Sequence, residues 1–295
     1  MGYASVREMA AKWKVSERSV RDYCQKGKIP GSFLVGKTWN IPDKAKKPER
    51  KSAVKAKRIL SGVLKEEMQD KVSGGIYHKI QIEFTYNSNH IEGSKLTHDQ
   101  TRYIYETNTI GAEAGVLNVD DIVETVNHFR CIDYVIMNMN KVITEKMIKE
   151  LQSILKTGTS DSQKAWFAVG DYKKLPNEVG GHETTTPECV HLEMKKLLEH
   201  YKKKEVCKID DLLDFHVSFE RIHPFQDGNG RVGRLLLLKE CLKYDIVPFI
   251  INDDLKLFYY RGLSEWSSER GYLRDTCLNA QDQFKEYLRY FRIDF

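Results

Sequence analysis

Apolar residues recur at helical spacing through most of the chain from about Ile59 onward, and this pattern constrains the fold most. Spacings of three and four residues place such side chains on one face of a helix. Four segments show the pattern: Ile76, Ile80, Phe84 and Ile91; Met147, Ile148, Leu151, Ile154 and Leu155, with Thr144 as the expected cap; Leu212, Phe215, Phe219 and Ile222; Phe284, Leu288 and Phe291. The sequence therefore predicts a mainly α body over residues 59–295.

The stretch Gly170–Pro187 interrupts this pattern. It is rich in Gly, Thr, Asn and Pro, which favour turns over helices. We expect a small β-hairpin or flap there.

The first 58 residues differ from the body in charge. They carry 16 Lys and Arg against 5 Asp and Glu, a net charge of +11 within a total of +5. A basic module joined to an acidic body indicates binding to a polyanion. A solvated basic surface is the alternative.

Residues 1–45 of this module are typical of helix, turn, helix and wing. Helices are predicted at about Ser5–Trp13 and Glu17–Gln25, followed by a hairpin around Gly36-Lys37 that Pro42 ends. The pattern resembles the winged helix-turn-helix of MerR-type and excisionase-type modules. That resemblance implies duplex DNA binding, although trihelical folds also bind proteins. The expected DNA contacts are Arg18, Ser19, Arg21 and Lys37.

Residues 46–58 lack apolar periodicity and are predicted to form a basic linker. No apolar run approaches the length of a membrane span, and charges near the N-terminus argue against a signal peptide. Six cysteines without a CxxC pair are interpreted as free thiols. We therefore expect a cytoplasmic protein with no membrane partner.

The run His223–Arg234 (HPFQDGNGRVGR) lies between two predicted helices, Asp210–Ile222 and Leu235–Lys243. Its Gly-Asn-Gly segment opens the second helix, where free backbone N–H groups and the helix dipole attract an anion. Arg231 and Arg234 share one helix face, as a di- or triphosphate site requires.

Two other residues of this run supply reactive groups. Asp227 offers a hard oxygen ligand for Mg²⁺, and His223 can accept a proton near neutral pH. The simpler alternatives are an Asn-Gly hairpin turn, a calcium loop and a core histidine. The flanking helices argue against a hairpin turn, and the missing ligands argue against a calcium loop. The phosphate-binding neighbours of His223 argue against a core histidine.

These twelve residues match the signature HPFx[D/E]GNGRxxR of Fic (Fido) proteins, and the resemblance extends over about residues 76–295. It implies a helical enzyme that transfers AMP from ATP to a Ser, Thr or Tyr hydroxyl of a target protein. His223 would be the general base and Asp227 would hold Mg²⁺. The remaining signature residues would bind phosphates: Gly228, Asn229, Gly230, Arg231 and Arg234. Phe225 is expected in the core.

The resemblance also covers the flap and a pair of aromatic residues. The hairpin in Gly170–Pro187 would dock the target, with Asn177, Glu178, Val179 and Gly180 nearest the nucleotide. Lys173 and Gln152 stand where the family usually has Arg and His. Tyr259 and Tyr260 would border the adenine pocket, with core packing as the alternative.

Ser88-Asn-His-Ile-Glu92-Gly93 resembles the inhibitory motif [S/T]xxxE[G/N] of such proteins. The resemblance implies that Glu92 pairs with Arg234 and displaces the γ-phosphate, or that it assists removal of AMP. The simpler alternative is a surface Glu at a helix end.

The sequence thus favours a Mg²⁺-dependent protein adenylyltransferase that is autoinhibited by Glu92 and has the capacity to form a homodimer. A Doc-like kinase, and a DNA-binding regulator or toxin that uses the Fic body as nucleotide sensor, remain alternatives. The intact Gly228-Asn229-Gly230 argues against the kinase.

Overall fold

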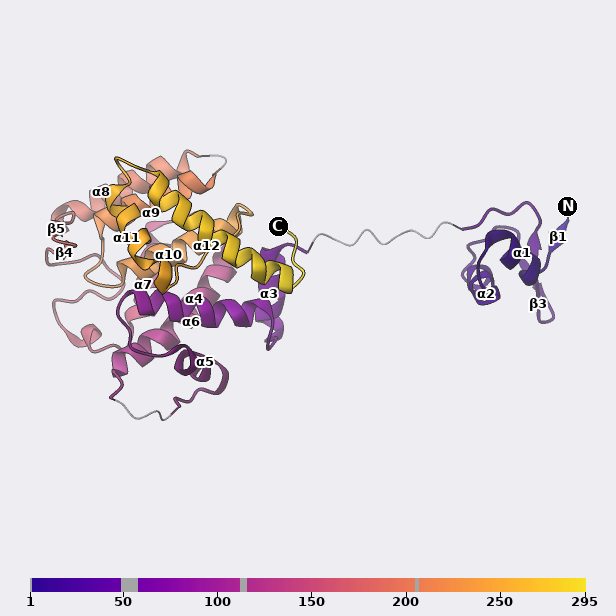
Figure 1. Ribbon diagram of the computed structural model, residues 1–295, viewed down its shortest axis with the longest axis horizontal. Helices are drawn as coiled ribbons and strands as arrows, with labels where there is room; N and C mark the ends of the chain where they lie inside the picture. Colours follow the sequence, from indigo (N-terminus) through magenta and orange to yellow (C-terminus); the bar gives the residue numbers. More distant parts are fainter. Residues whose placement is uncertain (1, 49–57, 112–115, 205–206) are drawn as a thin grey trace. The chain divides into compact units, whose positions relative to one another are not determined.

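The computed structural model describes residues 2–48, 58–111, 116–204 and 207–295. The chain divides into two compact units, Met1–Ala56 and Lys57–Phe295 (Figure 1). Most of the predicted linker, residues 49–57, lies outside the described residues.

The first unit has two short helices and a three-stranded antiparallel sheet with the order β1-β3-β2. Ser5 and Ser16 cap the helices, as residues that accept backbone N–H bonds at helix starts commonly do. The predicted helices and hairpin are present, whereas strand β1 was not expected. The elements are β1 (Tyr3–Ala4), α1 (Val6–Trp13), α2 (Glu17–Gln25), β2 (Phe33–Val35) and β3 (Thr38–Pro42).

The residues expected to contact DNA lie on α2 and in the turn between β2 and β3. Arg18 and Lys37 are exposed, and Arg21 forms an ion pair with Glu17 at 2.8 Å. Gly36 takes the positive φ of 61° that the two-residue turn requires. DNA binding by this unit stays a prediction.

The second unit is mainly helical, as the periodicity predicted, and its only sheet among the described residues is the hairpin β4–β5. Its elements are α3 (Leu60–Asp70), α4 (Ile76–Ile91), α5 (His98–Thr107), α6 (Val119–Asn138), α7 (Glu145–Lys156), the 3-10 helix η1 (Asp161–Gln163), β4 (Glu178–Val179), β5 (His182–Glu183), α8 (Pro187–Lys202), α9 (Ile209–Ile222), α10 (Asn229–Lys243), α11 (Asp253–Glu265) and α12 (Gly271–Tyr290).

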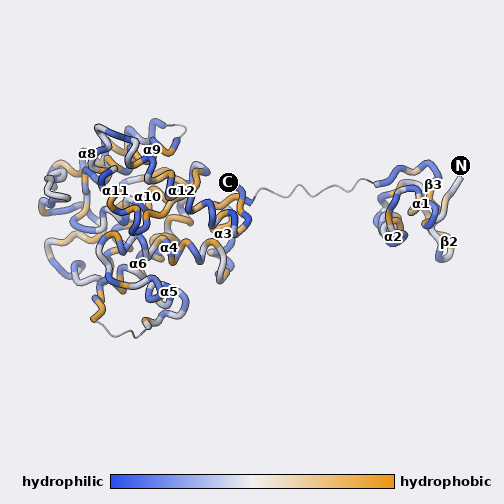
Figure 2. The backbone as a smooth tube through the Cα atoms, in the orientation of Figure 1, coloured by the Kyte–Doolittle hydropathy of each residue, from blue (hydrophilic) through white to orange (hydrophobic). Residues whose placement is uncertain are grey.

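Helix α10 runs through the interior of this unit (Figures 1 and 2). It packs against α9, α6, α7, α4 and α3, and only Gly230 and Lys243 of its residues are not buried. A helix that is buried all round needs apolar residues on every face, which the run Leu235–Leu238 provides. The start of α10 is therefore held rigidly by five neighbouring helices.

The six cysteines lie in the described ranges and are free thiols, as predicted. Five are buried, and only Cys189, near the start of α8, is exposed. Across the parts of the chain that the structure describes, we find no helix with the length and apolar character needed to cross a membrane.

Candidate active site

The loop between α9 and α10 carries His223 and is fixed by the side chain of Asn229. The Asn229 Oδ1 accepts the N–H of Phe225 at 2.8 Å, and its Nδ2 donates to the carbonyl of Phe225 at 2.9 Å. Phe225 is fully buried, as expected. His223 is the C-cap of α9 and takes a left-handed φ of 50°, which ends the helix there. These two hydrogen bonds of the buried Asn229 side chain fix the backbone conformation of the loop.

The N-terminus of α10 forms a bare backbone cradle. Gly228 is the N-cap, with φ of 87°, a conformation that favours glycine. A Cβ at Gly230 would collide with the carboxylate of Glu92 and lie 3.0 Å from Arg234 Nη1. The absence of a side chain at Gly230 therefore leaves room for charged groups at the first turn of α10, where an anion is favoured. A Cβ at Gly228 would instead lie 3.1 Å from Leu155 Cδ2.

The imidazole of His223 is neutral at neutral pH. Burial lowers its pKa to about 4, and the charge of Lys173 contributes in the same direction. A neutral imidazole can accept a proton, which is the state that a general base needs.

Arg234 is 5% exposed and faces the end of α4. Its Nη2 donates to Glu92 Oε1 at 2.7 Å and to the carbonyl of Ser88 at 2.9 Å, while its Nε donates to Ser88 Oγ at 3.0 Å. Burial alone would lower the pKa of Arg234, but the charge of Glu92 raises it. The structure thus brings Ser88, Glu92 and Arg234 together.

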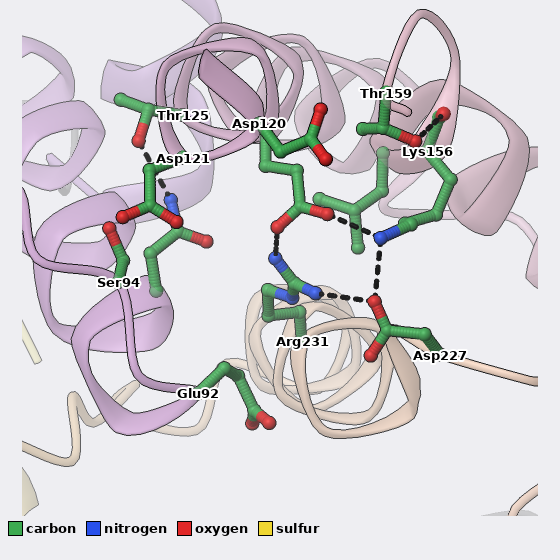
Figure 3. A network of polar contacts seen from close by, with 12 residues as sticks. Glu92, Ser94, Asp120, Asp121, Thr125, Lys156, Thr159, Asp227 and Arg231 are labelled. Carbon is green, nitrogen blue, oxygen red and sulfur yellow. Dashed lines mark hydrogen bonds and ion pairs between the residues drawn. The ribbon is translucent and has the colours of Figure 1, made fainter. Parts of the chain in front are cut away.

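Asp227 and Arg231 belong to a closed ring of alternating charges (Figure 3). Asp227 Oδ2 lies 2.6 Å from Lys156 Nζ and 3.2 Å from Arg231 Nη2. Glu124, on α6, contacts both cations and closes the ring. Although burial would raise the pKa of Asp227, the charges of Arg231 and Lys156 lower it to about 2. Asp227 is therefore ionised throughout the physiological range.

The carboxylate of Asp227 fits a metal ion that is shared with a phosphate. Its side chain is 45% exposed, and among the described residues no side chain bonds its Oδ1. No cluster of three or more metal-binding side chains occurs in the described ranges. Mg²⁺ is commonly held by one or two carboxylates together with substrate phosphates. A single available carboxylate beside an anion cradle matches that arrangement.

The hairpin β4–β5 lies in the stretch where a hairpin or flap was expected, and Lys173 joins its base to the loop between α9 and α10. The Lys173 N–H donates to the carbonyl of Pro224 at 2.9 Å, and its Nζ donates to Asn177 Oδ1 at 2.7 Å and to Thr184 Oγ1 at 2.6 Å. Asn177 in turn donates to the carbonyl of Phe225 at 3.1 Å. Burial lowers the pKa of Lys173 to about 8. Glu178, Val179 and Gly180 form the exposed tip.

Other predicted residues have structural contacts. Gln152 accepts the N–H of Gly170, where the flap begins, at 2.5 Å. Tyr259 is 1% exposed and its hydroxyl lies 2.6 Å from His216 Nε2, whereas Tyr260 is 41% exposed. Consecutive helical residues point about 100° apart. Tyr260 is therefore the one of the pair that is open to the surface.

Sequence reasoning missed several titratable residues around the site, namely Glu124, Lys156, Asp161, His216 and Glu220. Burial raises the pKa of Glu220 to about 8. His216, Glu220 and His223 are spaced by four and three residues along α9. That helical spacing beside the signature is the signal that points to His216 and Glu220.

Comparison with known proteins gives a consistent result for the second unit. Residues 142–241 match the family model described as the Fic/DOC family. A Protein adenylyltransferase Fic from Drosophila grimshawi is 25% identical over 225 residues, which are 73% of this chain and 42% of that protein. The corresponding protein of Aedes aegypti is 27% identical over 182 residues, covering 61% and 36%. The chain spans about two fifths of the length of these curated relatives.

Solved structures agree with this result. A Fic domain containing signaling protein from Bacteroides thetaiotaomicron is 26% identical, with a TM-score of 0.58 over 78% of this chain and 90% of that chain. Fic-1 from C. elegans has a TM-score of 0.58 at 19% identity, over 79% and 71%, and so shares the fold. Residues 142–241 of the second unit thus match the Fic/DOC family model, and the unit is similar in fold to solved Fic proteins.

Proposed function

We propose that this Fic-domain protein, which is homologous to proteins named Protein adenylyltransferase Fic, transfers AMP from ATP to a hydroxyl side chain of a target protein. The observation that carries the proposal is the convergence of His223, Asp227, Arg231 and Arg234 on the bare N-terminus of α10.

His223 acts as the general base. The target hydroxyl oxygen attacks the α-phosphorus of ATP, and the hydroxyl proton passes to the neutral imidazole. The bond between the α-phosphorus and the bridging oxygen breaks, and pyrophosphate leaves with the electron pair. The lowered pKa of His223, about 4, supports this role because the ring is unprotonated at neutral pH.

The triphosphate is bound by the amides of Gly228–Arg231 and by two guanidinium groups. Asn229 contributes its backbone N–H near the α-phosphate, since its side chain is taken up by Phe225. Arg231 binds near the β-phosphate and Arg234 binds the γ-phosphate. Asp227 would hold Mg²⁺, which when bound neutralises charge on the phosphate oxygens. The tip of the flap at Asn177–Gly180 and the exposed Tyr260 border the nucleotide. The 87° φ of Gly228 and the burial of both arginines support a preorganised anion site.

Glu92 keeps the enzyme inhibited. Its pairing with Arg234 at 2.7 Å supports this role, because a carboxylate and a γ-phosphate compete for one guanidinium fork. The same carboxylate, next to the phosphate site, would orient a water molecule for removal of AMP from a modified target.

The test is incubation of the full chain with ATP and cell lysate, followed by measurement of label on protein. The Glu92→Gly variant should transfer label from the α-position and none from the γ-position. The double variant Glu92→Gly/His223→Ala should transfer neither, while still binding nucleotide. Label from the γ-position would identify a kinase instead. Removal of AMP is measured on a target protein that already carries the α-label. Loss of this label on incubation with the parent, but not with Glu92→Gly, would reveal that activity.

A second function, duplex DNA binding by the first unit, is favoured by the charge of +11 over residues 1–58. Arg18 and Lys37 are exposed and available to contact phosphates.

A further inference from the structure

Lys156, the last residue of α7, is a buried cation beside the phosphate site that the proposed reaction does not use. Its side chain is 2% exposed. Its Nζ contacts three carboxylates from separate parts of the second unit: Asp227 at 2.6 Å, Asp161 at 3.3 Å, and Glu124. An ammonium group has three protons to donate, so it can serve all three carboxylates at once. The three oxygens therefore point at one shared position, which the ammonium fills.

This ammonium acts on the site through Asp227. A nucleotide phosphate with its metal ion can reach Asp227, whose side chain is 45% exposed, but not Lys156, whose side chain is 2% exposed. Arg231 approaches the same oxygen of Asp227 from the other side, at 3.2 Å (Figure 3). Asp227 is thus held in place by two cations before any ligand arrives.

We propose that Lys156 is a positioning residue that serves as the internal cation of the nucleotide site, so that a divalent metal ion enters only together with nucleotide phosphates. The three carboxylates form no metal site in the described ranges as they stand, and the position that their oxygens share is taken by the ammonium of Lys156. Lys156 also neutralises their charge. The open side of Asp227 then supplies a single carboxylate, which needs phosphate oxygens to complete the coordination of Mg²⁺.

The proposal rests on the proposed function for the identity of the nucleotide, but its test does not require AMP transfer. The probe is Mn²⁺, whose free concentration is followed by electron paramagnetic resonance with the full chain and no nucleotide. Lys156→Met keeps a long side chain and removes the charge. We expect it to bind Mn²⁺ at least about tenfold more tightly than the parent, because the carboxylates lose their internal cation.

Lys164→Met is the matched control. Lys164 also pairs with Asp161, at 2.5 Å, but its side chain is 45% exposed, and no contact joins it to Asp227 among the described residues. The same substitution there should produce no gain. Lys156→Arg retains the charge and should behave as the parent does. Adding Asp161→Asn to Lys156→Met should abolish the gain.

Tighter Mn²⁺ binding by Lys156→Met without nucleotide distinguishes this role from a purely structural one. Loss of a structural ion pair would lower the stability of the fold but would not raise the affinity for Mn²⁺. The proposal is overturned if folded Lys156→Met, checked by circular dichroism, binds Mn²⁺ no more tightly than the parent. If that variant does not fold, Lys156→Gln takes its place. The parent provides an independent check, since Mn²⁺ binding that is equally tight with and without a non-hydrolysable ATP analogue also overturns it. Failure of AMP transfer alone would refute only the proposed function.

Discussion

Arg234 Nη2 donates a hydrogen bond to Glu92 Oε1 at 2.7 Å, which joins the second arginine of the α10 signature to the end of α4. Two contacts from the same guanidinium to Ser88, at 2.9 and 3.0 Å, fix its orientation. The side chain of Glu92 is 29% exposed, so a phosphate group can reach the pair from solvent and replace the carboxylate at Arg234. This pair is therefore where we expect nucleotide and protein to compete.

Glu92→Gly should raise auto-AMPylation by at least about tenfold. A charge-assisted hydrogen bond contributes about 1.5–3 kcal/mol, which corresponds to one to two decades in the population of competent complexes. The measurement is incorporation of α-labelled ATP by the parent, by Glu92→Gly and by Glu92→Gly/Arg234→Ala. The double variant should lose the gain, because it also removes the partner of the phosphate. Equal incorporation by the parent and Glu92→Gly would show that Glu92 does not restrain the enzyme.

The pH profile should identify His223 as the base. Burial lowers the pKa of His223 to about 4, and the charge of Glu92 raises it, so removal of that charge lowers this pKa further. We therefore expect kcat/KM of the Glu92→Gly enzyme to be flat at neutral pH and to fall only at or below about pH 4. Adding Lys173→Met removes a positive charge that also lowers this pKa. The acid limb should therefore move upward, toward the ordinary value of 6.5. A limb that stays in place, with circular dichroism unchanged, would contradict the contribution of Lys173.

Binding of duplex DNA should weaken steeply with salt, because the first 58 residues carry a net charge of +11. Arg18→Ala or Lys37→Ala should each reduce the slope of log affinity against log salt by about 1. Gel retardation of the full chain at several salt concentrations measures this slope. Lys146→Ala, an exposed lysine of α7, removes the same charge outside the first unit and serves as the control. If the full chain does not retard DNA at low salt, DNA binding is excluded and the first unit is better interpreted as a protein-interaction module.

Gly262→Ala should destabilise the second unit. Gly262 is in α11, and a Cβ there would lie 2.6 Å from the Cα of Leu273 in α12, where neither backbone has room to move. Overpacking of this kind costs about 1–3 kcal/mol. Gly62→Ala is the matched control in α3, since its Cβ would meet only Ile59 Cγ1, at 3.7 Å. It should raise the free energy of unfolding by about 0.5–1 kcal/mol, because alanine favours the helix interior. Thermal unfolding of both variants tests the pair.

The sequence alone predicted the helices that carry the site, because their apolar spacing and caps are local signals. Thr144 caps α7, as expected, by accepting the N–H of Met147 at 3.2 Å. Residues 223–234 were singled out because they match one signature motif at every fixed position. Helices α3, α5, α6, α8 and α11 were not predicted individually, although α6 carries Glu124 of the site.

The ring around Asp227 was not predicted, because no local pattern encodes it. The contact between Lys156 and Glu124 joins residues 32 apart, that between Lys156 and Asp227 joins residues 71 apart, and that between Arg231 and Glu124 spans 107 residues. Only the packing of α6, α7 and α10 brings these charges together. The sequence also could not decide which of the adjacent Tyr259 and Tyr260 is buried, because that depends on how α11 packs against its neighbours.

The exposure of Cys189 allows the native protein to be labelled with a spectroscopic probe at a single site. It is the one exposed thiol of six, and it lies two residues into α8, the helix that follows the flap hairpin. A thiol-reactive fluorophore should therefore attach at this single position without removal of any other cysteine. Such a dye would report in real time on motion of the hairpin when a nucleotide or a target protein arrives.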